Sequence, residues 1–83
     1  SPDMYEMMQN VALKIERVDN KLEQIIDRFD ELENLMSQGI RDDFVKISKE
    51  YADLKDVVEK IRELQALKSS IKDLQEMMHH IYY

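Results

Sequence analysis

The sequence predicts an all-α fold: a long antiparallel helical hairpin, coiled-coil-like, that associates into a three- or four-helix bundle. Three observations carry this prediction. Apolar residues recur at alternating spacings of four and three along both halves of the chain, which is the period of a helix seam. The 83 residues include only one glycine and one proline, too few for the turns of a sheet. Charged residues make up 36% of the chain, as in long solvent-exposed helices.

The first helix is expected over about residues 3–36. Ser1 can cap its amino end, Pro2 suits the first helical position, and Asp3 complements the positive end of the helix dipole. A seam that repeats every 3.5 residues runs along this helix without interruption, and such a seam packs on other helices. It consists of Met4, Met8, Val11, Ile15, Val18, Leu22, Ile25, Phe29, Leu32 and Met36.

A turn over residues 37–40 follows the first helix. It contains Gly39, the only glycine, where a residue of left-handed conformation would end a helix. A second helix is expected over about residues 41–81, with Asp42 and Asp43 in its first turn. Because the connection is short, the two helices should be antiparallel neighbours within a single domain spanning residues 1–83.

The seam of the second helix changes phase near its middle. The first half of the seam consists of Phe44, Ile47, Tyr51, Leu54, Val58 and Ile61. The next positions in that register, Gln65 and Lys68, are polar, and the apolar series moves instead to Leu64, Leu67, Ile71, Leu74, Met78 and Ile81. A step of three residues where four is expected turns the buried face by about 100°.

Two interpretations of this shift are open. The helix continues and offers its second half to a different partner, or it breaks at Lys68–Ser70, with Ser70 and Asp73 forming a capping box for a third helix. One long helix is favoured, because serine costs little inside a helix and neither Gly nor Pro is present there.

The apolar face of the first helix is wider than a hairpin needs. Additional apolar residues flank the seam: Tyr5, Ala12 and Ile26 on one side, Met7 and Leu35 on the other. A wide face is typical of burial among three or four helices. The simplest way to cover it is self-association, and we expect a dimer.

Composition excludes several classes of function. The net charge of −6 argues against direct nucleic-acid binding, which needs clustered Lys and Arg. The absence of cysteine excludes disulfides and thiolate metal sites. No apolar run approaches the roughly 20 residues that span a bilayer, and the amino end lacks a signal pattern, so no membrane partner and a cytoplasmic location are expected.

No residue pattern indicates chemistry. His79 and His80 are adjacent, so on a helix they point about 100° apart and cannot hold one metal ion together. The sequence has no glycine-rich phosphate loop, and its serines have no His and acid at plausible triad positions. We therefore expect no catalytic residues, no metal, no cofactor and no small-molecule substrate.

One part of the chain is more specific than general coiled-coil composition. The segments concerned are Lys21–Glu33, Phe44–Leu54 (read as FVKISKEYADL), Val57–Ile61 and Asp73–Met78. Over about residues 21–78 the chain resembles the amino-terminal helical domain of bacterial peptide chain release factor 1. Residues 1–20 depart from that family's short start, and the third helix that follows in the family has no counterpart before Tyr83.

The resemblance implies a role in translation termination without catalysis. In that family the codon-reading loop and the Gly-Gly-Gln loop lie in later domains, and the one glycine here lies in a turn. The implied partner is the large ribosomal subunit, at the base of its stalk. Either the Met4–Val18 extension or a second chain would then cover the Leu64–Ile81 face. The alternative function is a self-assembling structural bundle, natural or designed, with no activity beyond folding and oligomerisation.

Overall fold

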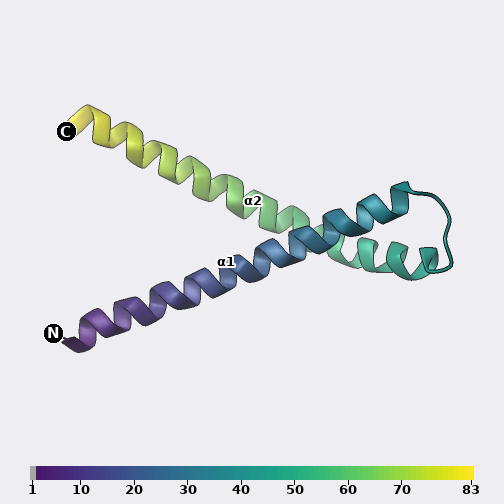
Figure 1. The fold of residues 1–83 in the computed structure, drawn as a ribbon. Coiled ribbons are helices and arrows are strands. Elements are labelled where there is room, and N and C mark those ends of the chain that lie inside the picture. The colour runs from purple at the N-terminus through teal and green to yellow at the C-terminus, as the bar shows by residue number, and fades with distance from the viewer. Residues whose placement is uncertain (1) are drawn as a thin grey trace.

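The structure, a computed structural model, describes residues 2–83 and consists of two helices (Figure 1). Helix α1 spans Pro2–Ser37 and helix α2 spans Phe44–Tyr82. The described residues contain no strand, so the predicted all-α helical hairpin is confirmed. Ser1, the expected cap of α1, lies outside the described residues.

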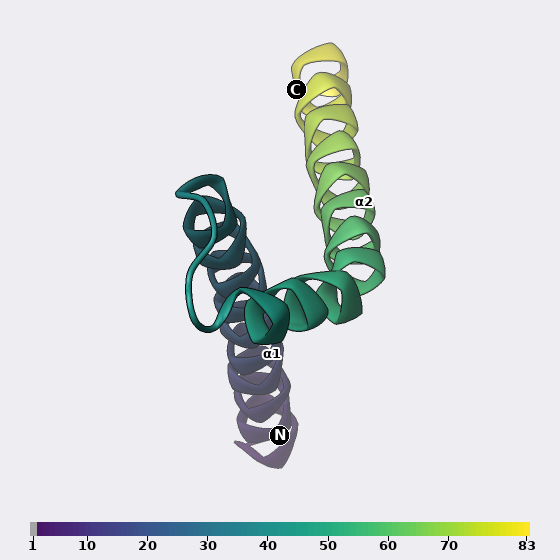
Figure 2. The same cartoon turned by 90° about the vertical axis from the view of Figure 1, so that its right-hand side faces the viewer.

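The two helices cross instead of running side by side over their full length. Figure 1 shows the turn at one end of the molecule, while the two chain ends diverge at the other; Figure 2 shows the same divergence from a second direction. The molecule is correspondingly flat and open, with extents of 58 × 35 × 17 Å. We call residues 2–18 the N-terminal arm and residues 69–82 the C-terminal arm.

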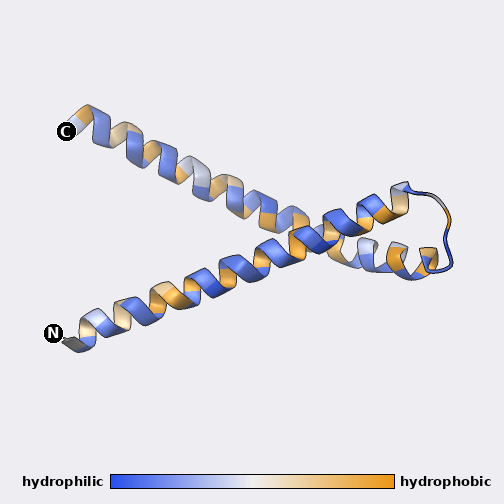
Figure 3. Ribbon diagram, in the orientation of Figure 1, coloured by the Kyte–Doolittle hydropathy of each residue, from blue (hydrophilic) through white to orange (hydrophobic). Residues whose placement is uncertain are grey.

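Apolar and polar residues alternate along both helices, as Figure 3 shows by its bands of orange and blue. Among the residues whose burial the structure describes (3–83), five apolar side chains are buried, and they belong to the half of the hairpin that contains the crossing and the turn. Leu32 and Val58 are the most enclosed, with 0% and 1% of their surface exposed. The whole buried core is Phe29, Leu32, Ile47, Val58 and Ile61. The core is therefore small and confined to the half of the hairpin nearer the turn.

The turn forms as the glycine suggests, but the second helix begins later than expected. Gly39 has a φ of +100°, and the Gln38 amide donates to the Leu35 carbonyl at 3.2 Å. Because α2 begins at Phe44, Asp42 and Asp43 precede its first turn, and the prediction that they lie within that turn was wrong. Asp43 takes the N-cap position and its carboxylate pairs with Arg41 at 2.5 Å.

Replacing Gly39 by alanine should lower the free energy of unfolding by about 1–2 kcal/mol, because an L-residue with a Cβ is strained at this φ. A Cβ at this position would meet no atom within 4 Å, so backbone strain alone would cause the loss. Thermal unfolding followed by circular dichroism measures the effect. Gln38→Ala is the matched control in the same turn, and an equal melting temperature for the two variants would contradict the argument.

Helix α2 passes through Lys68–Ser70 without interruption. The Ser70 hydroxyl donates to the Ala66 carbonyl one turn earlier, at 3.0 Å. This is a bond within a helix, and the serine does not cap a new one. The structure thus agrees with the first interpretation of the phase shift, in which the second helix continues without a break.

Candidate interaction surfaces

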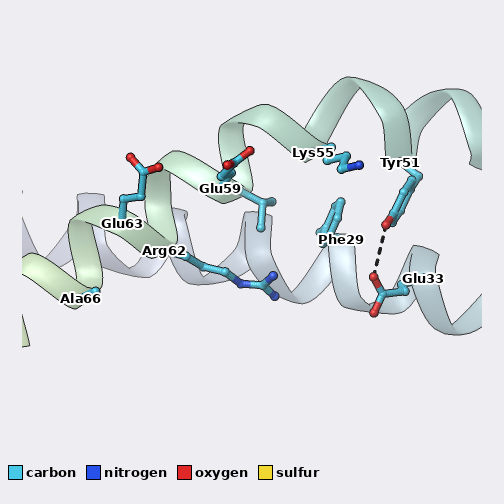
Figure 4. A pocket seen from close by; sticks show the side chains of 9 residues that line it. Phe29, Glu33, Tyr51, Lys55, Glu59, Arg62, Glu63 and Ala66 are labelled. Carbon is cyan, nitrogen blue, oxygen red and sulfur yellow. Dashed lines mark hydrogen bonds between the residues drawn. The ribbon is translucent and has the colours of Figure 1, made fainter.

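An aromatic cluster lies at the centre of the crossing. The rings of Phe29 in α1 and Tyr51 in α2 stack with centroids 4.6 Å apart, and the Arg62 guanidinium lies 5.8 Å from the Phe29 centroid. The Tyr51 hydroxyl donates to Glu33 at 3.3 Å, which ties the ring of α2 to the next turn of α1 (Figure 4). Stacked rings and a guanidinium over a ring face both stabilise a packed crossing.

A shallow groove of about 640 Å³ opens beside this cluster. Figure 4 shows Phe29 and Tyr51 on one side of it and the charged side chains of Lys55, Glu59 and Arg62 along α2. The acids and bases alternate along an open surface, so water reaches all of them. An open groove of mixed charge offers no water-excluded pocket in which a carboxylate could act as a general acid or base.

An ion pair between Arg28 of α1 and Glu50 of α2 also joins the two helices. The Nε of Arg28 donates to Glu50 Oε2 at 2.6 Å and its Nη2 to Oε1 at 3.3 Å, while Nη1 pairs with Glu31 at 3.2 Å. The hydrogen bond to Glu50 raises the pKa of the Arg28 guanidinium above its usual value, against a smaller opposing effect of desolvation. Because the pKa is raised on folding, this ion pair contributes stability at every pH below the ordinary pKa of arginine, and the contribution is lost only as the pH rises above that value.

The helices remain joined by polar contacts after the apolar contacts end. Gln65 donates to Glu23 at 3.0 Å, and Lys68 donates to Asp19 at 3.0 Å. Gln65 and Lys68 are the two polar residues that continue the register of Ile61. The sequence thus identified the positions that face α1, and the structure shows them making hydrogen bonds and an ion pair where apolar packing stops.

The arms diverge because the seam register of Ile61, Gln65 and Lys68, if continued along α2, would bury polar residues. Continuing it from Lys68 at steps of four, three and four reaches Lys72, Gln75 and His79. Closing the arms on each other would press these side chains against apolar residues of α1 such as Ile15. Burying polar and charged groups without partners is costly, and the arms separate instead.

The separation leaves two apolar faces exposed at the open end of the hairpin. The N-terminal face consists of Met8, Val11, Ile15 and Val18; the C-terminal face consists of Leu64, Leu67, Ile71, Leu74, Met78 and Ile81. Within them, Ile15 is 55% and Ile71 48% exposed. An apolar groove that includes Leu22, Ile61 and Leu64 leads from the crossing onto the C-terminal face.

The predicted seam residues therefore fall into three groups. The buried ones form the core given above. The half-buried ones surround it: Leu22, Ile25, Met36, Phe44, Tyr51 and Leu54. The exposed ones are Met4 together with all members of the two apolar faces. The Met4–Val18 extension does not cover the Leu64–Ile81 face within this chain, and the expectation that it could do so was wrong.

A third exposed apolar feature lies at the opposite end, beside the turn. Ile40 is 94% exposed and Val45 is 82% exposed. Neither belongs to the seam, and the sequence pattern gave no signal for them beyond their place outside the repeat. We call this pair the tip.

Chemistry is not indicated by any arrangement in residues 2–83. No group of three or more His, Asp or Glu side chains there is placed to hold a metal ion. His79 stacks on Tyr83 with centroids 5.0 Å apart, and His80 is exposed. Neither helix, over those same residues, is both long and apolar enough to cross a membrane.

These features define a class: an open helical hairpin with a small core at its crossing and apolar surfaces at both ends. Within the chain, 58 residues are 47% identical to the amino-terminal region of peptide chain release factor 1 from Rickettsia peacockii (strain Rustic), and equally to that from Rickettsia rickettsii (strain Sheila Smith). The protein from Rickettsia canadensis (strain McKiel) is 46% identical over 55 residues. The resemblance to release factor 1 is thereby confirmed.

The match covers different shares of the two proteins. It includes 69% of this chain but only 16% of each of the two first relatives, so the chain spans about a sixth of their length. No family model matches the chain. No solved structure matches it either.

Proposed function

We propose that the chain is a non-catalytic protein-interaction module of bacterial translation termination, which acts in the cytoplasm and binds the large ribosomal subunit. The observation that carries this proposal is the 47% identity to the amino-terminal region of peptide chain release factor 1. The open grooves of mixed charge agree with a binding role, because they offer no enclosed site for a substrate.

The charge of the chain favours a protein partner over ribosomal RNA. At a net charge of −6, the hairpin would be repelled by phosphate and attracted to a basic protein surface. The tip is the best candidate for the contact. Ile40 and Val45 are apolar, almost fully exposed and lie at the turn end of the helical hairpin. An apolar anchor residue of a small interface would have these properties.

The 83-residue chain should co-sediment saturably with purified large ribosomal subunits and not with small subunits. Intact peptide chain release factor 1 should compete for the same site. Replacing Ile40 by aspartate should weaken binding by about tenfold or more, because it places a charge in the apolar anchor. The matched control is Leu13→Asp, an exposed apolar residue of α1 outside the seam and far from the tip.

The outcomes separate the parts of this proposal. Equal binding by Ile40→Asp and Leu13→Asp would overturn the assignment of the tip. Absence of binding by the unmodified chain would overturn the ribosomal function itself.

The second candidate function is a self-assembling structural bundle, with no activity beyond folding and oligomerising. The two exposed apolar faces favour it, because such faces on a small protein usually mark an interface. A chain that forms a defined oligomer but fails to sediment with ribosomal subunits would support this candidate.

A further inference from the structure

We infer that the N-terminal face of one chain packs on the C-terminal face of a second copy and vice versa, giving a two-fold symmetric dimer whose arms form a four-helix bundle. This inference does not depend on the ribosomal function. It assigns an occupant to each of the two faces at the open end of the hairpin.

The chain cannot cover these faces by itself. The apolar stripe from Leu64 to Ile81 is turned by about 100° from the register that faces α1. The ion pair between Lys68 and Asp19 and the hydrogen bond between Gln65 and Glu23 hold α2 in the original register. Rotating α2 to aim Leu64 at α1 would break both contacts and carry Val58 and Ile61 out of the core. Helix α1 of the same chain therefore leaves the C-terminal face uncovered.

The exposed surface of the chain is large enough for a dimer. A compact folded chain of 10.0 kDa exposes about 5,200 Å². This chain exposes 7321 Å², which is an excess of roughly 2,100 Å². A standard interface needs about 800 Å² from each partner, so even half of the excess would suffice.

The two faces overlap in length and are alike in chemistry. At 1.5 Å per residue the N-terminal face (8–18) is roughly 15 Å long and the C-terminal face (64–81) roughly 25 Å, so the longer face can accommodate the whole of the shorter one. The positions flanking the faces include apolar residues such as Met7, together with charged ones, among them Lys14 on α1 and Glu63 on α2. Flanking charges of opposite sign on the two helices suit an interface between two copies of the same chain. One isologous interface satisfies both faces of both copies.

Solution mass provides the first test. Light scattering or sedimentation equilibrium on the 83-residue chain should give about 20 kDa, twice the mass of one chain. Ile71→Lys should weaken the dimer by about 100-fold or more, since it places a charge in the centre of the interface. Ile71 is exposed in the single chain, so the lysine leaves the core of the hairpin intact. Ser69→Lys, on the same arm outside the face, should remain dimeric.

Cross-linking tests the reciprocal arrangement. The chain has no cysteine, so introduced thiols are the only ones that can react. Val11→Cys and Ile71→Cys lie near the middle of the two faces and should meet whichever way the paired arms run. Mixed and oxidised, the two variants should give the heterodisulfide in excess over either homodisulfide.

Three results would overturn the inference. A monomer at every concentration would assign the faces to some other occupant, and a dimer that withstands Ile71→Lys would place the interface elsewhere. Predominant homodisulfides would show that like faces pair, which contradicts the reciprocal arrangement.

Discussion

Replacing Ile61 by aspartate is expected to unfold the hairpin. Ile61 is one of the five side chains that are buried within residues 3–83, and it lies at the crossing where α2 leaves α1. A carboxylate there would be desolvated without a partner, at a cost of about 3 kcal/mol or more. A core this small cannot absorb such a loss. Circular dichroism should show the cooperative transition of the parent replaced by low helicity at ordinary temperature.

The matched control for this variant is Val45→Asp. It makes a similar exchange of a β-branched residue for an acid in the same helix, but at a side chain that is almost fully exposed. Its melting temperature should stay within a few degrees of the parent. An Ile61→Asp chain that melts as Val45→Asp does would show that the crossing does not hold the two helices together.

Replacing Phe29 by alanine is expected to have the second largest effect, a loss of about 3–5 kcal/mol in the free energy of unfolding. Phe29 fills the crossing, stacks on Tyr51 and receives the guanidinium of Arg62 on its ring. Alanine removes the apolar packing, the ring stacking and the contact with the guanidinium. It also leaves a cavity, because the remaining contacts between the helices keep them from closing over the lost volume. Urea unfolding measured by circular dichroism gives the difference directly.

Two companion variants divide that effect into its parts. Phe29→Leu keeps most of the apolar volume and loses the ring stacking, so it should cost about 1 kcal/mol or somewhat more. Leu13→Ala removes an exposed apolar side chain and should be nearly neutral. If Phe29→Ala were no worse than Leu13→Ala, the aromatic cluster would not contribute to stability.

The periodicity of the sequence was sufficient to predict the secondary structure and the antiparallel order of the helices. The four-three spacing extends through both, and the single glycine marks the turn between them. The predicted start of the second helix was less accurate than its predicted existence. Residues 41–43 form a turn and α2 begins only at Phe44, with Asp43 at the N-cap position but without a side-chain cap hydrogen bond. Residue types do not specify the first residue of a helix to within one or two positions.

The interaction surfaces were only partly predictable. The sequence identified every apolar residue of the seam and the phase shift near Leu64, yet it could not show which seam residues face each other within one chain. It also gave no signal for the pairing of Arg28 with Glu50, since charges are dispersed along both helices and any of several pairs was possible. The exposed tip at Ile40 and Val45 was missed for a different reason: both residues lie outside the seam, and the apolar repeat gives no signal for positions beside it.

The sequence by itself determined that this protein is two amphipathic helices joined by a short turn, because apolar periodicity is a local property of each helix. Only the tertiary structure decided where the helices touch and where they separate. That outcome depends on whether the residues opposite each other across the crossing are both apolar. They are at Phe29 and Val58, and they cease to be at Gln65 and Lys68, so the hairpin opens there and leaves its remaining apolar faces exposed.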